Sequence, residues 1–325
     1  MTMAAAIQVG EGSYLGWRAL WLRGPEFALA LVPEVGGRIM GVEWRGQQLA
    51  FANPDLAGQV EDVAAVSDVR ARKRALGFVL WGGDKTWLAP QTHWADDMPF
   101  LDLDSGAYEV SIETAPAGSA AVRLTSPVCR ESGMQIERRI RVAPGEPGWQ
   151  VTHRLRNCSS RTVAWAPWIV AMFRRPAHVF LPTRADSAYP DGVKTFAEEG
   201  ESRDVRSDVV ACVGDAVCID CTGNRHFKFG TDAVVGTAFA VLDVPGHGRV
   251  GIRKQVPTFH PRPYAHGCVA EVFNSPQYPY FELEMHGPVV ELAPGESFAL
   301  EETAQLEDVP DWPVSGAVLS HALAS

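Results

Sequence analysis

The chain has 325 residues, of which 46% are hydrophobic and 21% are charged, a composition that supports a sizeable folded core. Its 29 Lys and Arg residues are outnumbered by 39 Asp and Glu residues, which gives a formal net charge of -10. This charge repels phosphate backbones and anionic membrane surfaces, so we expect neither nucleic acid nor a membrane as a partner.

The sequence gives no sign of export or membrane insertion. A basic start followed by a long apolar run is absent, and no stretch approaches roughly 20 consecutive apolar residues. We therefore predict a cytoplasmic protein whose six cysteines stay reduced. Cys218 and Cys221 form a single CxxC pair at a predicted strand end, which we interpret as buried structural thiols rather than a zinc or redox site.

Short runs with a hydrophobic residue at every second position recur along the chain and are typical of antiparallel sheets. Turns rich in Gly and Pro separate these runs. Because no linker interrupts them, we expect residues 1–325 to form a single domain of two large sheets packed face to face. The predicted strands are 27–32, 38–44, 107–114, 120–125, 134–142, 149–156, 162–173, 234–243, 249–255, 268–273, 280–285 and 297–306.

Residues 56–76 are the only segment with a helical pattern, since acidic residues come early in it and basic residues late, as the helix dipole prefers. We expect the basic residues at its end to be solvated. Residues 196–206 are predicted to form a polar excursion between strands.

Residues 81–94, with the sequence WGGDKTWLAPQTHW, combine tryptophans with a glycine pair and several polar side chains. Sugars bind to such combinations, because their C–H faces stack on aromatic rings while their hydroxyls need hydrogen-bond partners. The alternative is a tryptophan-rich corner of the core with an internal Asp84–Lys85 pair. The candidate site residues here are Trp81, Asp84, Lys85, Trp87, Gln91, His93 and Trp94.

Two later segments could add side chains to the same site. The predicted strand 162–173 contains a tryptophan and is followed by arginines that could bind a hydroxyl-rich or acidic sugar. The proline-rich loop 259–267 contains an arginine and a histidine, although such a loop can also be an ordinary connector. The candidates from these segments and the strand after the loop are Trp168, Arg174, Arg262, His266 and Asn274.

Two carboxylates, Glu282 and Glu284, lie two positions apart on a predicted strand and therefore point to the same face. Like charges at this spacing raise each other's proton affinity, which suits one of them to act as a general base near neutral pH. The alternative is a solvated outer strand face, but the flanking aromatic and aliphatic residues favour an interior strand.

Four segments, taken together, resemble the galactose mutarotase-like superfamily. They are LVPEVGGRIMGVEWRGQQLAFANP, WGGDKTWLAPQTHW, VTHRLRNCSSRTVAWAPWIV and FELEMHGPVVELAPGESFALEET, and the similarity is closest to a bacterial branch with the block GG-x-K-x-W-x-APQ. The resemblance implies an all-β fold, a large antiparallel β-supersandwich with a sugar in a cleft on its concave face.

The resemblance also implies roles for individual residues. Aldose 1-epimerases of this superfamily use a late carboxylate as base, which corresponds to Glu284, with Glu282 nearby. Where relatives carry histidines, this chain has other residues, so Lys85, His93 or His266 would supply the acid.

We therefore expect a protein that binds a small-molecule carbohydrate and isomerises it as an aldose 1-epimerase does, with no metal and no cofactor. Two alternatives remain open. One is a carbohydrate-binding protein without catalytic activity, and the other is an enzyme that cleaves glycosides or acidic sugars with Asp84 and Glu284 as its acid and base. The sequence contains no Gly-rich phosphate loop, Gly-x-Ser-x-Gly elbow or HExxH motif, which argues against those nucleotide, serine-hydrolase and zinc-protease sites.

Overall fold

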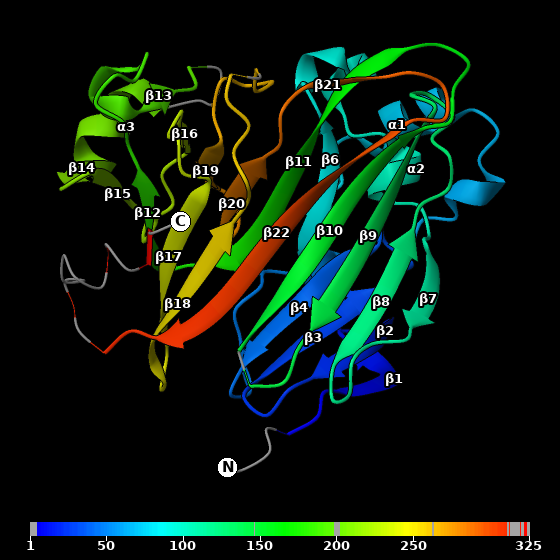
Figure 1. Cartoon of the computed structure of the whole chain (residues 1–325), viewed down its shortest axis with the longest axis horizontal. Helices are drawn as coiled ribbons and strands as arrows, with labels where there is room; N and C mark the ends of the chain where they lie inside the picture. Colours follow the sequence, from blue (N-terminus) through cyan, green and yellow to red (C-terminus); the bar gives the residue numbers. More distant parts are fainter. Residues whose placement is uncertain are drawn as a thin grey trace.

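The structure is a computed structural model, and it describes residues 5–145, 147–197, 202–261 and 263–310 together with residues 312, 319, 322 and 323. The strands of this part of the chain form two large antiparallel sheets. In Figure 1 strands β22, β10, β9 and β8 lie in front, with β4, β6 and β11 behind them. This is the predicted all-β architecture.

The first sheet contains twelve of the described strands in the order β1-β2-β3-β4-β6-β11-β20-β19-β16-β13, with β5 paired to β4 and β21 paired to β11. Their bounds are β1 (Gln8–Tyr14), β2 (Trp17–Arg23), β3 (Phe27–Val32), β4 (Arg38–Trp44), β5 (Gln47–Gln48), β6 (Asp84–Ala89), β11 (Val163–Arg174), β13 (Lys194–Thr195), β16 (Phe227–Thr231), β19 (Ala270–Asn274), β20 (Tyr280–His286) and β21 (Val290–Leu292).

The second sheet contains ten of the described strands in the order β14-β15-β12-β17-β18-β22-β10-β9-β8-β7. Their bounds are β7 (Glu109–Glu113), β8 (Ala120–Thr125), β9 (Met134–Val142), β10 (Gly148–Asn157), β12 (Ala177–Pro182), β14 (Val210–Val213), β15 (Ala216–Asp220), β17 (Thr237–Val244), β18 (Gly248–Gln255) and β22 (Ser297–Asp308).

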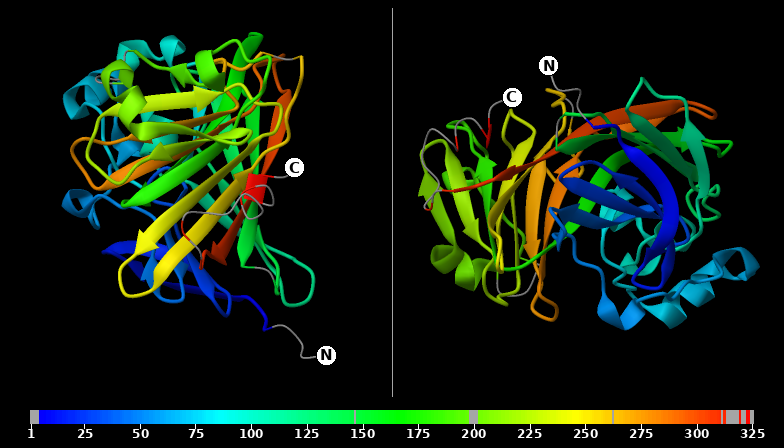
Figure 2. Two further views of the ribbon diagram at one scale, coloured as in Figure 1. Left: turned by 90° about the vertical axis from the view of Figure 1, so that its left-hand side faces the viewer. Right: turned by 90° about the horizontal axis from the view of Figure 1, so that it is seen from below.

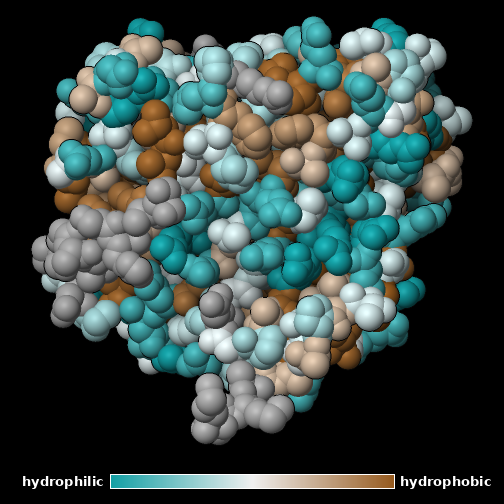
Figure 3. Space-filling model, in the orientation of Figure 1, coloured by the Kyte–Doolittle hydropathy of each residue, from teal (hydrophilic) through white to brown (hydrophobic). Residues whose placement is uncertain are grey.

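The main core lies between the two sheets, which Figure 2 shows from two further directions. In β9 every second residue is buried, as expected for a strand with one face on the core. The outer face of the ten-stranded sheet is mainly hydrophilic across its middle (Figure 3). By contrast, all residues of β6 and β20 are buried, so both faces of these strands are covered.

The predicted strand bounds agree with β3, β4, β8 and β9, and those of the other eight predicted strands differ by one to three residues at one or both ends. The remaining strands were not predicted. The helix prediction for residues 56–76 was wrong over most of its length, because only α1 (Val69–Leu76) is α-helical and Val63–Ala65 adds a single 3-10 turn. Asp68 caps the start of α1 by accepting a hydrogen bond from the Ala71 N–H, and Gly77 ends it at a positive φ of 67°.

Two other helices were not predicted. The short α2 (Leu101–Asp104) follows the tryptophan-rich segment, and α3 (Ser202–Val209) occupies much of the segment that was predicted as a polar excursion. α3 buries Ser202, Val205 and Val209, which recur on one helix face. Among the described residues, no helix is both long and apolar enough to cross a membrane.

Candidate functional site

Five neighbouring strands, β6, β11, β20, β19 and β16, carry most of the candidate site. Side chains at paired positions of antiparallel strands point to the same face of the sheet. We call the face that these side chains share the site face. Its three rows are Trp87, Trp168 and His286; Lys85, Val170, Glu284 and Glu271; and Glu282, Phe273 and Lys228.

The other face of the same strands packs on the core between the sheets. In β20, Phe281, Leu283 and Met285 belong to the main hydrophobic core. Alternation along the strand then turns Glu282 and Glu284 to the site face. The strand therefore holds two carboxylates in place by anchoring the apolar residues between them.

A pair of glycines positions the start of β6. Gly82 and Gly83 have φ values of 101° and 69°, which glycine adopts more readily than residues with a Cβ atom. A Cβ at Gly82 would lie 2.5 Å from the Phe51 carbonyl oxygen, and one at Gly83 would lie 2.8 Å from the Ile39 carbonyl oxygen. These contacts leave no room for a side chain, so the glycine pair lets β6 begin close to its neighbours.

A pocket of about 210 Å³ opens on the site face. Three indoles form its aromatic wall, and their ring centroids are separated by 5.1 to 5.6 Å. We call it the tryptophan pocket. Its lining residues are Phe78, Trp87, Gln91, Trp94, Trp168, Lys228, Phe273, Tyr280 and Glu282.

Larger surface hollows occur elsewhere, such as one of about 760 Å³ beside β1 and β7. The charged residues that line this hollow, Glu11, Arg18 and Glu34, belong to no buried ionisable cluster. The tryptophan pocket is smaller, but it adjoins several buried ionisable side chains. We therefore take it as the candidate site.

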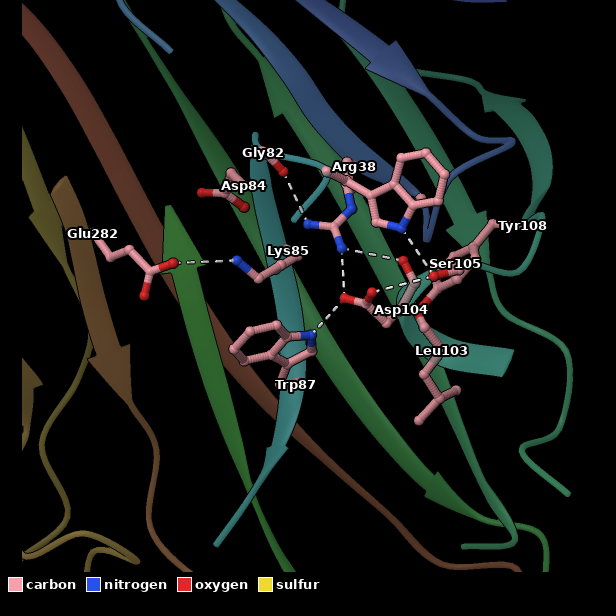
Figure 4. A network of polar contacts seen from close by, with 12 residues as sticks. Arg38, Gly82, Asp84, Lys85, Trp87, Leu103, Asp104, Ser105, Tyr108 and Glu282 are labelled. Carbon is pink, nitrogen blue, oxygen red and sulfur yellow. Dashed lines mark hydrogen bonds and ion pairs between the residues drawn. The ribbon is translucent and has the colours of Figure 1, made fainter. Parts of the chain in front are cut away.

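Trp87 is fixed by a hydrogen bond from its indole N–H to Asp104 Oδ1 over 2.8 Å. The buried Arg38 guanidinium binds the same carboxylate and also donates to the Gly82 carbonyl oxygen over 2.9 Å. Figure 4 shows this network beside the Trp87 indole, with Lys85 reaching from β6 toward Glu282. These bonds fix the position of the Trp87 indole in the wall of the pocket.

Lys85 is a buried lysine with no hydrogen-bond partner for its ammonium. Its Nζ atom lies 3.8 Å from Glu282 Oε1 and 4.2 Å from the centroid of the Trp87 ring. Burial lowers the pKa of Lys85 to about 8, although the Glu282 carboxylate opposes this shift. Lys85 therefore titrates close to physiological pH.

Glu284 has no exposed surface. Its Oε2 atom accepts hydrogen bonds from the Trp168 indole N–H over 2.6 Å and from Lys228 Nζ over 3.0 Å, while Oε1 has no partner. Burial raises the pKa of Glu284 well above its usual value, and the nearby carboxylates of Glu271 and Glu282 add to the shift, although Lys228 opposes it.

Next to Glu284 lies a group that we call the histidine cluster, formed by His266, Glu271 and His286. Glu271 Oε1 is 3.1 Å from His266 Nδ1 and 3.1 Å from His286 Nε2. Glu271 Oε2 is 2.9 Å from Lys228 Nζ. Burial alone would raise the pKa of Glu271, but His286 and Lys228 hold it well below the usual value.

The structure brings eight of the sequence-predicted residues to one place. Trp87, Gln91, Trp94, Trp168 and Glu282 line the tryptophan pocket. Lys85 and Glu284 contact this lining from behind, and the ring centroid of His266 lies 4.7 Å from that of Trp168. The segments around residues 81–94 and 282–284 therefore meet at one pocket.

Asp84 lies on the opposite face of β6. Its carboxylate binds Arg138 and also Lys254, the latter over 2.6 Å, in the interior between the sheets. Asp84 and Glu284 thus point to different faces of the sheet and are not an acid–base pair. Trp81 is also away from the pocket, since it packs in a second core cluster and donates a hydrogen bond to Ser105 Oγ over 2.9 Å.

Three further predicted residues do not reach the pocket. His93 is exposed and lines a different hollow beside Trp165, and Arg174 is exposed at the end of β11. Asn274 is buried and donates to the carbonyl oxygens of Gly223 and Arg225, so it supports a turn. Arg262 lies outside the described residues.

Sequence reasoning missed several residues of the site. Lys228 lies on β16, which was not predicted, although the alternation in Phe227-Lys228-Phe229 is a strand signal that places the lysine opposite two aromatic residues. His286 continues the alternation of Glu282 and Glu284 by one more step. The remaining residues that were missed are Phe78, Glu271, Phe273 and Tyr280.

No protein-family model matches the chain, and no curated protein matches it in sequence. Solved structures do match it. A galactose mutarotase-like protein from Clostridium acetobutylicum has a TM-score of 0.55 and 11% identity, with 94% of this chain and 99% of that chain covered. A galactose mutarotase-like protein from Lactobacillus casei has a TM-score of 0.56 and 11% identity, with 89% and 100% covered.

A TPR-domain containing protein from Parabacteroides distasonis matches with a TM-score of 0.57 and 14% identity over 91% of this chain. Our chain spans 48% of that protein, so about half of it has no counterpart here. At these identities the comparisons establish the fold. The chain has the galactose mutarotase-like fold.

Proposed function

We propose that the tryptophan pocket binds a small carbohydrate. The observation that carries this proposal is the lining of the pocket, in which three indoles stand beside the polar groups of Gln91, Glu282 and Lys228. Indole faces stack on the C–H face of a sugar ring, and the polar groups can pair with its hydroxyls. The fold supports the same ligand class, because neighbours with this fold are galactose mutarotase-like proteins.

The size of the pocket favours a single sugar ring. Its volume of about 210 Å³ is below the roughly 300–1,000 Å³ typical of sites for drug-sized ligands. A long oligosaccharide would extend far beyond the indole wall. The proposed ligand is therefore a monosaccharide.

The proposed reaction is interconversion of the two anomers of an aldose. Glu282 would take the proton of the anomeric hydroxyl while the bond between the anomeric carbon and the ring oxygen breaks, and a cation at the pocket would supply a hydrogen bond or proton to that oxygen. Burial would lower the pKa of Lys228, but Glu271 and Glu284 raise it, so Lys228, which lines the pocket, suits a hydrogen bond to that oxygen rather than proton donation. Lys85 adjoins Glu282, and its lowered pKa supports a role as the proton donor. Reclosure on the other face of the aldehyde returns both protons.

Glu282 is better placed than Glu284 to act as the base. Its side chain is 11% exposed and lines the pocket, whereas the carboxylate of Glu284 is fully enclosed behind Trp168 and Lys228. We therefore assign the base to Glu282 and a positioning role to Glu284, which holds the Trp168 indole and the Lys228 ammonium.

Polarimetry on freshly dissolved aldoses tests the reaction. The protein should accelerate mutarotation of at least one aldose, and Glu282→Gln should lower the rate by about 10²- to 10⁴-fold, the usual contribution of a general base. The exposed Glu291 serves as a matched control, and Glu291→Gln should leave the rate unchanged. Unaltered equilibration of every aldose at high protein concentration would reject the isomerase.

A second candidate function is carbohydrate binding without turnover. It is favoured by the enclosure of Glu284 and by the pocket lining, which contains no histidine among the described residues. Calorimetry distinguishes the two: sugar binding that survives Glu282→Gln, with no mutarotation by either protein, would support a binding protein. Absence of binding to any monosaccharide would contradict both functions.

A further inference from the structure

The histidine cluster gathers three groups of the types that hold metal ions. The donor atoms of His266, Glu271 and His286 all lie within 4.8 Å of one another. Glu271 Oε1 is 3.1 Å from a ring nitrogen of each histidine. Donor atoms bound at about 2.0–2.2 Å to one ion stand about 3 Å apart, so the two shorter separations already fit a shared ion. The third, between the two histidines, would have to shorten slightly on binding.

The His286 ring is oriented so that its nitrogen could bind the same ion as the Glu271 carboxylate. The ring is fully buried, and neither of its nitrogens has a hydrogen-bond partner, even though Nε2 lies 3.1 Å from Glu271 Oε1. The two atoms are close without the alignment that a hydrogen bond requires. His286 Nε2 can therefore direct its lone pair at an ion, whereas His266 Nδ1 is hydrogen-bonded to Glu271 Oε1 over 3.1 Å and would exchange that bond for one to the ion.

Neighbouring side chains fix the carboxylate and the loop histidine. Lys228 Nζ binds Glu271 Oε2, which leaves Oε1 on the side of the two histidines. Hydrogen bonding of a ligand's second oxygen is typical of metal sites, where it orients the carboxylate. Lys194 Nζ donates to the His266 carbonyl oxygen over 2.6 Å, and the Tyr189 hydroxyl donates to the Gly267 carbonyl oxygen, so the loop that carries His266 is also anchored.

We propose that His266, Glu271 and His286 bind a divalent first-row transition-metal ion. Two imidazoles and one carboxylate suit ions such as Fe²⁺, Co²⁺ and Zn²⁺, whereas Mg²⁺ and Ca²⁺ prefer sites made of oxygen ligands alone. With three protein ligands, the ion keeps positions for water or a further ligand. No metal was expected from the sequence, because the three ligands come from a loop and two strands with no recognisable spacing motif.

The test is titration of the full-length protein, treated first with a chelator, with Co²⁺ and Zn²⁺ in the absence of sugar. We expect saturation close to one ion per chain, with visible Co²⁺ absorption bands that reflect nitrogen and oxygen ligands. His266→Gln and His286→Gln should each weaken binding by at least about 10- to 100-fold, the loss seen when even the supporting residues of a metal site are removed. His247→Gln, in the turn between β17 and β18, should bind as the wild type does.

Several outcomes would overturn the proposal. They are no Co²⁺ or Zn²⁺ binding by the wild type, wild-type affinity in His266→Gln, or a preference for Mg²⁺ over both transition metals. If His286→Gln fails to fold by circular dichroism, His266→Gln decides the result alone, because that ring is partly exposed on a loop. The measurement does not use sugar, so its outcome is separate from that of the proposed carbohydrate function.

Discussion

Burial of the charged Lys85 side chain on the site face is energetically unfavourable. Its ammonium has lost water without gaining a hydrogen bond, and its nearest charged group, Glu282, is 3.8 Å away. A buried ammonium that lacks a strong partner favours its neutral form. The folded protein therefore binds this proton less tightly than the unfolded chain, with a pKa of about 8 against the usual lysine value of 10.5.

Replacement of this lysine should stabilise the protein in a pH-dependent way. At pH 7 both states are protonated and the folded state bears the full penalty, so Lys85→Met should raise the free energy of unfolding by up to about 3 kcal/mol. As the pH rises from 8 to 10, the wild type releases the proton on folding and gains stability by about 1.4 kcal/mol per pH unit.

Urea denaturation of both proteins between pH 7 and pH 10 measures this effect. The stability difference between Lys85→Met and the wild type should shrink steadily above pH 8. A difference that stays constant across this range, or grows with pH, would contradict a depressed pKa at Lys85.

At the same scale, the sequence predicted the composition of the pocket better than the direction of each side chain. Residues 81–94 were expected to contribute together, yet Lys85 and Trp87 face the site while Asp84 turns to the core. A strand sends successive side chains to opposite faces, so direction depends on recognising the strand and its register. Because β6 was not predicted as a strand, its side chains could not be assigned to one face of the sheet or the other.

Strands were predictable where an apolar run or an alternation marks them: the bounds of the fully buried β3 and of the half-exposed β9 were both predicted. β9 alternates between buried and partly or fully exposed residues, and its predicted bounds match. β6 is also buried on both faces, but it begins with the polar residues Asp84, Lys85 and Thr86, so it shows neither an apolar run nor an alternation. The edge strand β1 was missed because six of its seven residues are exposed and no apolar stripe marks it.

The position of a strand in its sheet should decide how it tolerates proline. β22 is paired on both sides, with Ala304 opposite Trp149 on β10 and Lys254 on β18. Proline there removes a ladder hydrogen bond, so Ala304→Pro should lower the free energy of unfolding by about 3 kcal/mol or more.

The edge strand β7 provides the comparison for this substitution. One of the successive residues Val110 and Ser111 must point its N–H away from β8, so one of Val110→Pro and Ser111→Pro should be much milder than Ala304→Pro. Thermal unfolding of the three variants provides the test. Equal losses at all three positions would show that edge and central strands do not differ.

A buried ionic network joins the two sheets of the molecule. Asp84 on β6 binds Arg138 on β9 and Lys254 on β18, and Lys254 also lies 2.9 Å from Glu302 on β22. Burial alone would raise the pKa of Asp84, but Lys254 and Arg138 lower it below the usual value. The network therefore needs Asp84 in its ionised form.

Removal of this charge should destabilise the whole sandwich. Asp84→Asn leaves two buried cations with too little negative charge, and we expect a loss of about 3–5 kcal/mol in the free energy of unfolding at pH 7. The difference from the wild type should shrink below about pH 4. There the unfolded chain binds a proton at Asp84 before the folded protein does, so the wild type loses the stability that the ionised carboxylate provides.

Chemical denaturation at pH 7 and pH 3 measures both parts of this prediction. The exposed Asp186, which pairs with Arg184 at the surface, is the control, and Asp186→Asn should leave the denaturation midpoint where it is. A wild-type midpoint in Asp84→Asn would mean that the network does not contribute to holding the sheets together.

Trp168 stands at the boundary between the pocket and the charged groups behind it. Its indole lines the pocket, its N–H binds Glu284, and its ring lies against that of His266. Indole emission depends on the polarity and charge around the ring. A sugar arriving on one side or an ion arriving on the other should therefore change the protein's own fluorescence. Because the chain has ten tryptophans, loss of the change in Trp168→Phe would assign it to this ring.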